Sequence, residues 1–76
     1  MWILTQSDNA VNMDIAVRVG IINYDTGCWS KIVAETDGTA TVLGEYKRNR
    51  VDSVFESVVN AITGEYPANV YIMPQD

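Results

Sequence analysis

Residues 28–46 read CWSKIVAETDGTATVLGEY, with Asp37-Gly38 between two stretches that alternate apolar and polar residues. An Asp-Gly pair in this setting is the strongest short-range signal for a β-hairpin with a two-residue turn of type I′. Such a turn fixes the register, because its flanking residues, Thr36 and Thr39, must then face each other. The stretch therefore predicts two paired antiparallel strands.

Counting back from the turn separates the two faces of this hairpin, because successive side chains of a strand point to opposite sides. The expected pairs are Ile32 with Leu43, Val33 with Val42, and Trp29 with Tyr46. One face then carries Cys28, Ile32, Ala34 and Leu43, and the opposite face carries Trp29, Val33, Val42 and Tyr46. Both faces are apolar, and one helix covers only one of them. We therefore expect the second set to be an interaction face for a protein partner or for a second copy in a homodimer, unless an N-terminal hairpin with Trp2 folds across it.

The residues after the hairpin predict an amphipathic helix, since their apolar positions recur with the period of 3.6 residues. Asn49 is a suitable N-cap, and Gly64 suits the left-handed conformation that commonly follows a helix. We predict a helix from about 50 to 63 that packs on one face of the sheet. Its apolar stripe consists of Val51, Val54, Phe55, Val58, Val59 and Ile62.

Further strands are predicted on both sides of this unit. Residues 15–22 alternate cleanly and predict the central strand, residues 1–6 and 10–13 predict a first hairpin, and residues 68–73 predict a short strand at a sheet edge. The expected fold is α+β: a single domain, residues 1–76, with a twisted antiparallel sheet of about five strands, one helix and a short C-terminal strand. The alternative is a small, partly open β-barrel capped by the helix.

The composition excludes several kinds of site. The chain of 76 residues has no His and a single Cys, so it lacks imidazole catalysis, His-containing zinc sites and an intrachain disulfide. We expect no enzyme activity, no cofactor and no metal. Cys28 suits a small core residue in the reducing cytoplasm, and we expect neither a signal peptide nor a membrane-spanning segment.

Asp25-Thr26-Gly27 matches the core of the motif found in retroviral-type aspartic proteases, in which two subunits each donate one Asp. In that motif two apolar residues precede the Asp, whereas Asn23-Tyr24 precede it here. The next apolar-apolar-Gly segment, Val42-Leu43-Gly44, follows too closely to leave room for a flap. We interpret the triplet as a hairpin loop that uses Asp and Gly for their turn geometry.

The charged residues leave two further functions open. The formal net charge is −5, so we do not expect a nucleic acid as partner. Cations in a first helical turn oppose the helix macrodipole by about 0.3–1 kcal/mol each, which a bound phosphate or nucleotide would offset. Lys47, Arg48 and Arg50 therefore form a candidate anion site, against the simpler alternative of a solvated turn paired with nearby acids. The acidic residues are scattered along the sequence; gathered on one surface, they would indicate an inhibitor that mimics DNA.

Several short motifs resemble those of a known group. The chain opens with Met1-Trp2-Ile3, has Leu43-Gly44-Glu45-Tyr46 before the predicted helix, and carries Met73-Pro74 after it. It resembles small uncharacterised proteins of bacteria and their prophages, which typically share Met-Trp-Ile, Leu-Gly-X-Tyr before an amphipathic helix, and a late Met-Pro. The sequence departs where Leu4-Thr5-Gln6-Ser7 replaces the usual Arg-Ser-Gln. The resemblance implies a mobile-element or accessory protein with a sheet and one helix, and it supplies no catalytic residue.

Taken together, these patterns predict a small acidic cytoplasmic protein that acts as a non-catalytic protein–protein interaction module, encoded by a phage or other mobile element. The alternatives are a phage-type inhibitor of a host enzyme or defence system, and an anion or nucleotide binder at the helix N-terminus.

Overall fold

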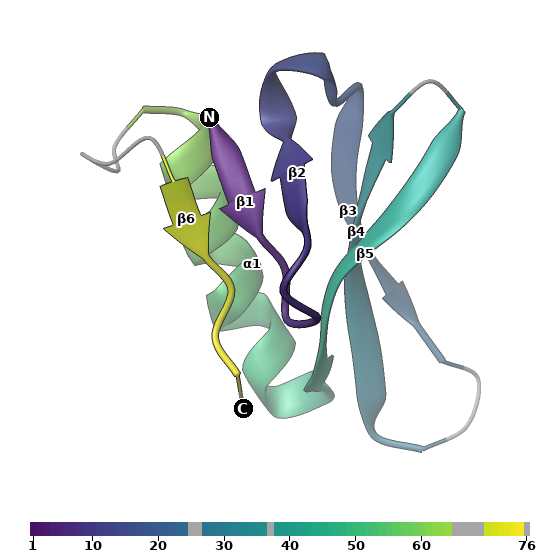
Figure 1. The fold of residues 1–76 in the computed structure, drawn as a ribbon. Helices are drawn as coiled ribbons and strands as arrows, with labels where there is room; N and C mark the ends of the chain where they lie inside the picture. Colours follow the sequence, from purple (N-terminus) through teal and green to yellow (C-terminus); the bar gives the residue numbers. More distant parts are fainter. Residues whose placement is uncertain (25–26, 37, 65–69, 76) are drawn as a thin grey trace.

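The computed structural model describes residues 1–24, 27–36, 38–64 and 70–75. It has an α+β fold in which one helix accompanies two sheets of three strands each (Figure 1). The predicted class is confirmed, but the strands form two sheets rather than one sheet of about five, and the described strands do not close into a barrel. The elements are β1 (Trp2–Leu4), β2 (Ala10–Asn12), the 3₁₀ helix η1 (Met13–Ile15), β3 (Arg18–Asn23), β4 (Trp29–Thr36), β5 (Thr39–Lys47), α1 (Arg48–Ile62) and β6 (Val70–Ile72).

The larger sheet has the order β3-β4-β5, and both neighbouring pairs are antiparallel. The prediction that residues 15–22 form the central strand was wrong, because β4 lies in the middle and β3 is an edge strand that begins at Arg18. Residues 13–15 form η1 instead, where the Asn12 side chain accepts a hydrogen bond from the N–H of Asp14. A side chain that bonds to a nearby backbone N–H in this way favours a turn, even where the alternation of apolar and polar residues favours a strand.

Near its turn, the β4–β5 hairpin has the predicted register. Thr36 faces Thr39, and Val33 faces Val42. Gly38 has a φ of +77°, a conformation that favours glycine and that two-residue hairpin turns require. The Asp-Gly pair therefore located this turn correctly.

Farther from the turn the register differs from the prediction. A β-bulge at Leu43 adds one residue to β5, and Tyr46 consequently faces Ser30 instead of Trp29. The predicted pairing of Ile32 with Leu43 is wrong for the same reason. A shift of one residue moves side chains to the other face of a strand. Tyr46 is accordingly fully buried in the core, and it does not share a face with Trp29.

The bulge is stabilised by a residue from the N-terminal hairpin. The N–H of Gln6 donates to the carbonyl oxygen of Leu43 at 3.0 Å, and the Gln6 Oε1 accepts from the N–H of Glu45 at 2.7 Å. Its Nε2 donates to the carbonyl oxygen of Pro74 at 3.0 Å. Gln6 thereby satisfies backbone groups on the outer edge of β5 that no neighbouring strand pairs with.

The smaller sheet has the order β2-β1-β6. β1 and β2 form the predicted first hairpin, and β6 is the predicted edge strand. The pairing of β6 with β1 is parallel, however, so this sheet is mixed and not wholly antiparallel as expected. Figure 1 shows β6 beside β1, with β2 on the other side of β1.

α1 begins earlier than predicted, directly at the end of β5. Lys47 is the N-cap, and no side chain caps the helix, so the assignment of Asn49 as N-cap was wrong. The N–H of Arg48 donates instead to the carbonyl oxygen of Cys28 at 2.7 Å. This bond satisfies one of the N–H groups that a capping side chain would otherwise serve. No helix among the described residues is both long and apolar enough to cross a membrane.

The buried side of α1 is narrower than the predicted stripe. Phe55 is half-buried, and Val59 and Ile62 are 37% and 39% exposed. The helix ends as predicted, with Gly64 at a φ of +90° after its C-cap. The helix side chains that are buried are Val51, Val54, Val58 and Ala61.

One hydrophobic core joins both sheets and the helix. α1 contacts β3, β4 and β5, while β1 and β6 contribute from the smaller sheet. The buried hydrophobic side chains are Ile3, Met13, Ile32, Ala34, Leu43, Tyr46, Val51, Val54, Val58, Ala61, Tyr71 and Met73. The faces of both sheets that point away from this core carry exposed hydrophobic side chains, among them Trp2 and Trp29.

Candidate interaction surface

The outer face of the larger sheet is built from cross-strand rows, and we call it the Trp29 face. At one end, the Nη2 of Arg18 lies 3.3 Å from the Oε2 of Glu35 in an exposed ion pair. The next row has only apolar residues, and the row after it combines one apolar residue with two charged residues. The aromatic ring of Trp29 lies toward the other end of the face. The rows are Arg18–Glu35–Ala40, Gly20–Val33–Val42, Ile22–Lys31–Glu45 and Trp29–Lys47.

Three large hydrophobic residues of this face are exposed to solvent. Trp29, Ile22 and Val42 are 43%, 45% and 39% exposed, and Val33 is half-buried between them. Trp29, Val33 and Val42 were predicted to share a face, and they do. Ile22 was missed as their neighbour, because the register between β3 and β4 has no local signal comparable to the Asp-Gly turn.

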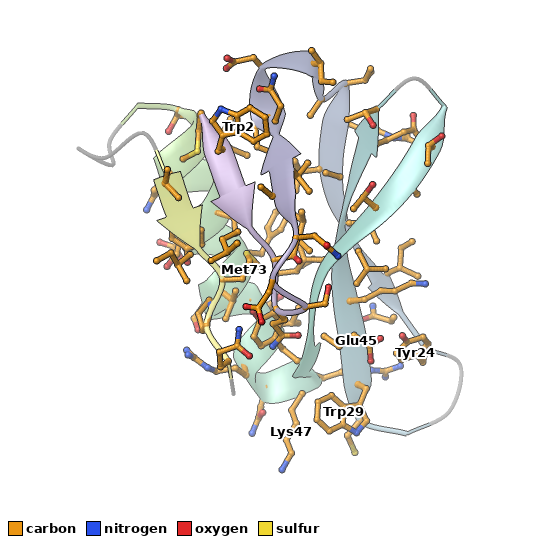
Figure 2. The ribbon with its side chains drawn as sticks, in the orientation of Figure 1. Trp2, Tyr24, Trp29, Glu45, Lys47 and Met73 are labelled. Atoms are coloured by element: carbon orange, nitrogen blue, oxygen red, sulfur yellow. The ribbon has the colours of Figure 1, made fainter. Side chains whose placement is uncertain are left out.

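The N-terminal hairpin does not cover the Trp29 face. Its Trp2 belongs to the smaller sheet, where it pairs with Asn12 and Val70 and is 46% exposed. The expected alternative, in which this hairpin folds across Trp29, is therefore incorrect. Figure 2 shows Trp2 and Trp29 at opposite ends of the molecule.

Tyr24 extends the Trp29 face at its aromatic end. Its N–H donates to the carbonyl oxygen of Trp29 at 3.3 Å, and the Nζ of Lys31 lies 5.6 Å from the centre of its ring. Desolvation raises the pKa of Tyr24 above its usual value, and the nearby Glu45 carboxylate raises this pKa further. Tyr24 is therefore a neutral phenol at pH 7. Figure 2 shows Tyr24 near Glu45, and Trp29 near Lys47.

The three residues of the predicted anion site lie where β5 joins α1, but they point to different partners. The guanidinium of Arg48 donates to the carbonyl oxygen of Tyr24, and the Nη1 of Arg50 donates to the Oγ of Ser53 at 3.3 Å. Lys47 is exposed and lies between two hollows. The three basic side chains therefore do not converge on one point.

These two hollows differ in their walls. One, of about 310 Å³, is lined by Trp29, Lys47, Asn49 and Arg50. The other, of about 480 Å³, is lined by Gly27, Cys28, Lys47, Arg48 and Asn49. The first opens beside the indole of Trp29 and so belongs to the Trp29 face.

A further hollow lies at the opposite end of the same face, over Gly20. It measures about 380 Å³, and its lining includes Ile22, Val33, Glu35 and Ala40. A Cβ added to Gly20 would meet no heavy atom within 4 Å. The space above this glycine is therefore open to a side chain from another molecule.

Cys28 is exposed, so the expectation that it is a small core residue was wrong. It precedes β4, and its carbonyl oxygen accepts from Arg48. The side chain therefore falls outside the region that the helix covers.

Of the protease-like triplet, Asp25 and Thr26 lie outside the described residues, and Gly27 has a φ of +84°.

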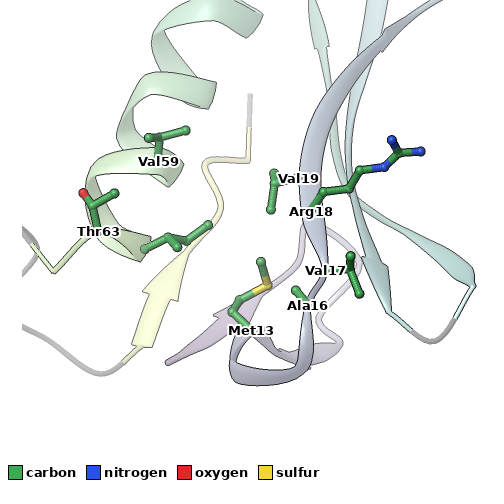
Figure 3. Close-up of a pocket in the computed structure, with 8 residues that line it drawn as sticks. Met13, Ala16, Val17, Arg18, Val19, Val59 and Thr63 are labelled. Carbon is green, nitrogen blue, oxygen red and sulfur yellow. The ribbon is translucent and has the colours of Figure 1, made fainter.

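An apolar groove of about 240 Å³ separates the C-terminal half of α1 from the segment that joins η1 to β3 (Figure 3). Val59 and Ile62 line the helix side, and Met13 and Val19 line the other. Val59 and Ile62 belong to the apolar stripe of the predicted helix and were therefore expected to pack in the core. The groove was not predicted, because the chain turns aside at η1 before β3 begins.

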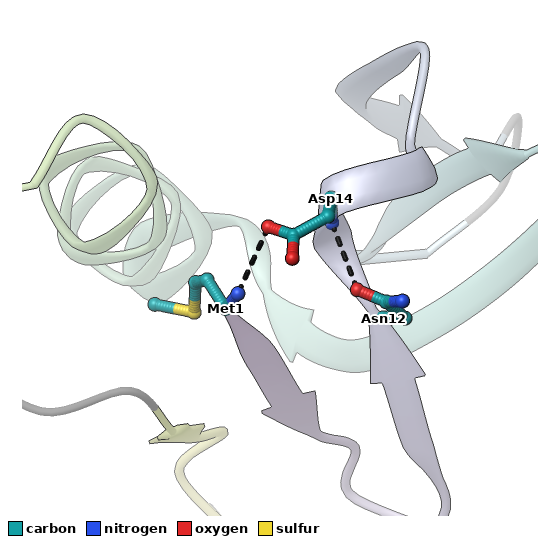
Figure 4. A network of polar contacts seen from close by, with 3 residues as sticks. All are labelled: Met1, Asn12 and Asp14. Carbon is teal, nitrogen blue, oxygen red and sulfur yellow. Dashed lines mark hydrogen bonds and ion pairs between the residues drawn. The ribbon is translucent and has the colours of Figure 1, made fainter.

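A polar network holds η1 close to β1. The N-terminal ammonium of Met1 donates to the Asp14 Oδ1 at 2.9 Å, and the N–H of Asp14 donates to the Asn12 Oδ1 at 3.0 Å (Figure 4). Asp14 is thus part of an exposed ion pair within the chain.

The smaller sheet also exposes apolar side chains on its outer side. Val70 and Ile72 of β6 are 46% and 62% exposed and pair with Trp2 and Leu4 of β1. This outer side carries no charged residue among the described ones, in contrast to the Trp29 face.

The described acidic side chains do not gather on one surface. Glu35 and Glu45 lie on the Trp29 face among basic residues, whereas Asp52 and Glu56 lie on the exposed side of α1. Within the described residues, no group of three or more His, Cys, Asp or Glu side chains could hold a metal ion.

Comparison with models of protein families, with curated proteins and with solved structures finds no match to this chain.

Proposed function

We propose that this protein is a non-catalytic protein–protein interaction module that binds its partner through the Trp29 face. The observation that carries the proposal is the joint exposure of Trp29, Ile22 and Val42 on neighbouring strands of one sheet. Exposed apolar patches rimmed by charged residues commonly mark interaction sites. Trp and Arg are also the residues that most often dominate binding energy.

We further propose that the protein acts in the cytoplasm and is encoded by a phage or other mobile element, in line with the resemblance described above. The exposed thiol of Cys28 supports a reducing compartment, since an exposed unpaired thiol readily oxidises elsewhere.

The two alternative functions have weaker support. An inhibitor that acts through an acidic surface needs its carboxylates close together, and the described ones are spread over several elements. A nucleotide site at Lys47, Arg48 and Arg50 needs these side chains directed to one ligand, whereas Arg48 and Arg50 donate to Tyr24 and Ser53 respectively.

A pair of photo-crosslinking variants tests the proposed function in cells that produce the protein. A benzophenone side chain replaces Val42 on the Trp29 face in one variant and Glu56 on the exposed side of α1 in the other. We expect Val42 to give discrete protein adducts that Glu56 does not give. Equal adducts from both positions, or none from either, would refute an interaction module that uses the Trp29 face.

A further inference from the structure

β3 has one edge that pairs with no other described strand. It pairs with β4 along its whole length, and of the described strands none pairs with its opposite edge. The N–H of Tyr24 donates to the carbonyl oxygen of Trp29, in register with the pairs before it. Backbone groups alternate in direction along an antiparallel strand, so the N–H and C=O groups of Val19, Ile21 and Asn23 point away from β4. These three residues present hydrogen-bond donors and acceptors along the open edge.

This edge lacks the features that usually prevent strand pairing. Edge strands of natural proteins are commonly very short, bulged, or marked by Pro or Lys. The register of β3 on β4 is uninterrupted over its whole length, and β3 contains neither Pro nor Lys. The outer edge of β5, by contrast, has a bulge at Leu43 that bonds to Gln6, and β2 and β6 have 3 residues each. Among the described edges, that of β3 is therefore the best suited to take up another strand.

The side chains of β3 that point toward α1 are incompletely covered. Val19 and Ile21 are half-buried, whereas Ala34 and Ile32, their partners on β4, are fully buried. The apolar groove beside α1 adjoins Val19, and Figure 3 shows this side chain facing the helix across the groove. Val17, which also lines the groove, is 73% exposed. The inner face of the sheet thus has room for further side chains beside β3.

Hollows lie on both faces of the sheet next to this one strand. The groove of about 240 Å³ is on the inner face, and the hollow of about 380 Å³ over Gly20 is on the outer face. Arg18 and Val19 line both of them. Successive side chains of a strand point to opposite faces, so a strand added at this edge would direct one side chain to the groove and the next to the hollow. Aliphatic walls, such as Val59 in the groove and Val33 in the hollow, favour aliphatic side chains.

We propose that the open edge of β3 binds an extended segment of another polypeptide as an additional strand, whose successive aliphatic side chains occupy the groove and the hollow. An extended backbone supplies acceptors and donors with the same two-residue repeat as the edge. In recognition of this kind, main-chain hydrogen bonds give affinity and pockets for alternate side chains give specificity. The edge is a second contact surface and requires no contact with Trp29, so the proposal goes beyond the function proposed above.

A second copy of β3 is a poorer occupant of this edge. Ile22 is the one aliphatic side chain that β3 has on the outer face, where it alternates with Arg18 and Gly20. When two β3 strands pair antiparallel with Ile22 of one copy opposite Gly20 of the other, Asn23 lies opposite Val19. Its amide would then meet the apolar groove, and burying an amide without a partner is unfavourable. A segment of another protein is free of this constraint.

Backbone N-methylation of a peptide tests the proposal, because it removes hydrogen-bond donors and keeps the side chains. The first peptide has a core of alternating valine and isoleucine between lysines, and only its isoleucines are N-methylated, so one edge keeps its N–H groups. In the second peptide every core residue is N-methylated. The third keeps the methylation pattern of the first but has serine side chains in the core. We expect the first peptide to bind at least about tenfold more tightly than either of the others.

Hydrogen exchange measured by NMR shows where the first peptide binds. We expect it to slow the exchange of the amides of Val19, Ile21 and Asn23 and to change those of Gly20 and Ile22 little, since these already bond to β4. Equal slowing along β3, or slowing elsewhere only, would overturn the proposal. Slowing of the same three amides by high protein concentration without peptide would assign the edge to a second copy.

A pair of variants at one position tests the edge from the side of the protein. Ile21→Pro removes the central donor of the open edge and leaves the bonds to β4, and proline is tolerated on edge strands. Ile21→Ala shortens the same side chain and keeps the N–H. We expect Ile21→Pro to weaken the first peptide about tenfold more than Ile21→Ala does. The dispersion of the NMR signals shows whether each variant is folded.

The contrary results are distinct from one another. Equal binding of the first two peptides would assign the contact to side chains alone, and equal binding of the serine peptide would exclude a role for the two hollows. Either result, equal effects of two folded variants, or no binding of the first peptide at millimolar concentration would overturn the proposal. If Ile21→Pro does not fold, the peptides decide. The cross-links from Val42 decide the function of the Trp29 face separately.

Discussion

Among the described residues, Gly44 is the glycine whose added Cβ would meet other atoms within 4 Å. This Cβ would lie 2.7 Å from the Cε2 and 2.8 Å from the Oη of Tyr46, because the buried ring packs over the glycine. The Tyr46 hydroxyl in turn donates to the carbonyl oxygen of Pro74 at 2.7 Å. The ring is therefore held on both sides and has little freedom to move away.

We expect Gly44→Ala to lower the free energy of unfolding by about 1–3 kcal/mol, the usual cost of overpacking a core. Gly20→Ala is the matched control on β3, because its Cβ would meet no atom within 4 Å. Urea denaturation of the two variants measures the difference. If both variants unfold at the same urea concentration as the unmodified protein, the packing of Tyr46 over Gly44 is incorrect.

The pKa of Tyr24 gives a second test at the scale of single residues. Desolvation is the largest cause of its rise and the Glu45 carboxylate is the next, so Glu45→Gln should lower this pKa without returning it to about 10. The pKa of Tyr24 is higher in the folded state than in the unfolded state. The stability that the protonated Tyr24 hydroxyl contributes is therefore present below about pH 10, and it is lost as the pH rises through the folded-state pKa.

An NMR titration of the Tyr24 ring signals measures the shift. Glu35→Gln changes the other glutamate of the same face and serves as the control. A pKa of Tyr24 that responds equally to both substitutions would show that Glu45 has no specific contact with it.

At the scale of elements, α1 presents two adjacent valines with different surroundings. Val58 is fully buried, while Val59 lines the surface groove and is 37% exposed. We expect Val58→Ala to lower the free energy of unfolding by about 2–3 kcal/mol, from the lost methyl groups and the cavity that they leave. Val59→Ala should cost clearly less. Thermal denaturation of both variants checks this, and a larger effect at Val59 would place the helix in a different rotation.

The sequence predicted those elements whose cause is local. The Asp-Gly pair located the turn between β4 and β5, and the period of the apolar residues located α1. The bulge at Leu43 had no local signal, because its freed backbone groups bond to Gln6, a residue far away in the sequence. Tyr46 was assigned to the wrong face because the one additional residue that the bulge places in β5 was not predicted.

The candidate surface was predicted only in part for the same reason. The shared face of Trp29, Val33 and Val42 follows from the hairpin itself. Val33 and Val42 pair on the turn side of the bulge, and Trp29 lies on β4, whose regular alternation the bulge does not change. Their neighbours Ile22 and Tyr24 depend on how β3 aligns with β4, and the sequence offers no local constraint on this alignment.

At the scale of the whole molecule, the exposed apolar side chains of the Trp29 face predict self-association. We expect a face-to-face homodimer that buries Trp29, Ile22 and Val42, because exposed apolar patches commonly mark interfaces. Sedimentation over a range of protein concentrations measures the dimer. Trp29→Glu should abolish it while the chain stays folded, since Trp29 lies outside the core. A dimer that persists in this variant would instead use the uncharged outer side of the smaller sheet.

The parallel pairing of β1 with β6 has a consequence for synthesis on the ribosome. β1 is made first, yet its edge partner is made more than sixty residues later, and the N–H of Met73 then donates to the carbonyl oxygen of Leu4 at 3.0 Å. A nascent chain that has emerged only through α1 lacks Tyr71 and Met73, both of them core residues. Its final collapse must therefore wait until residues 70–75 have left the exit tunnel. Translation products that stop before β6 should accordingly be held by chaperones or degraded.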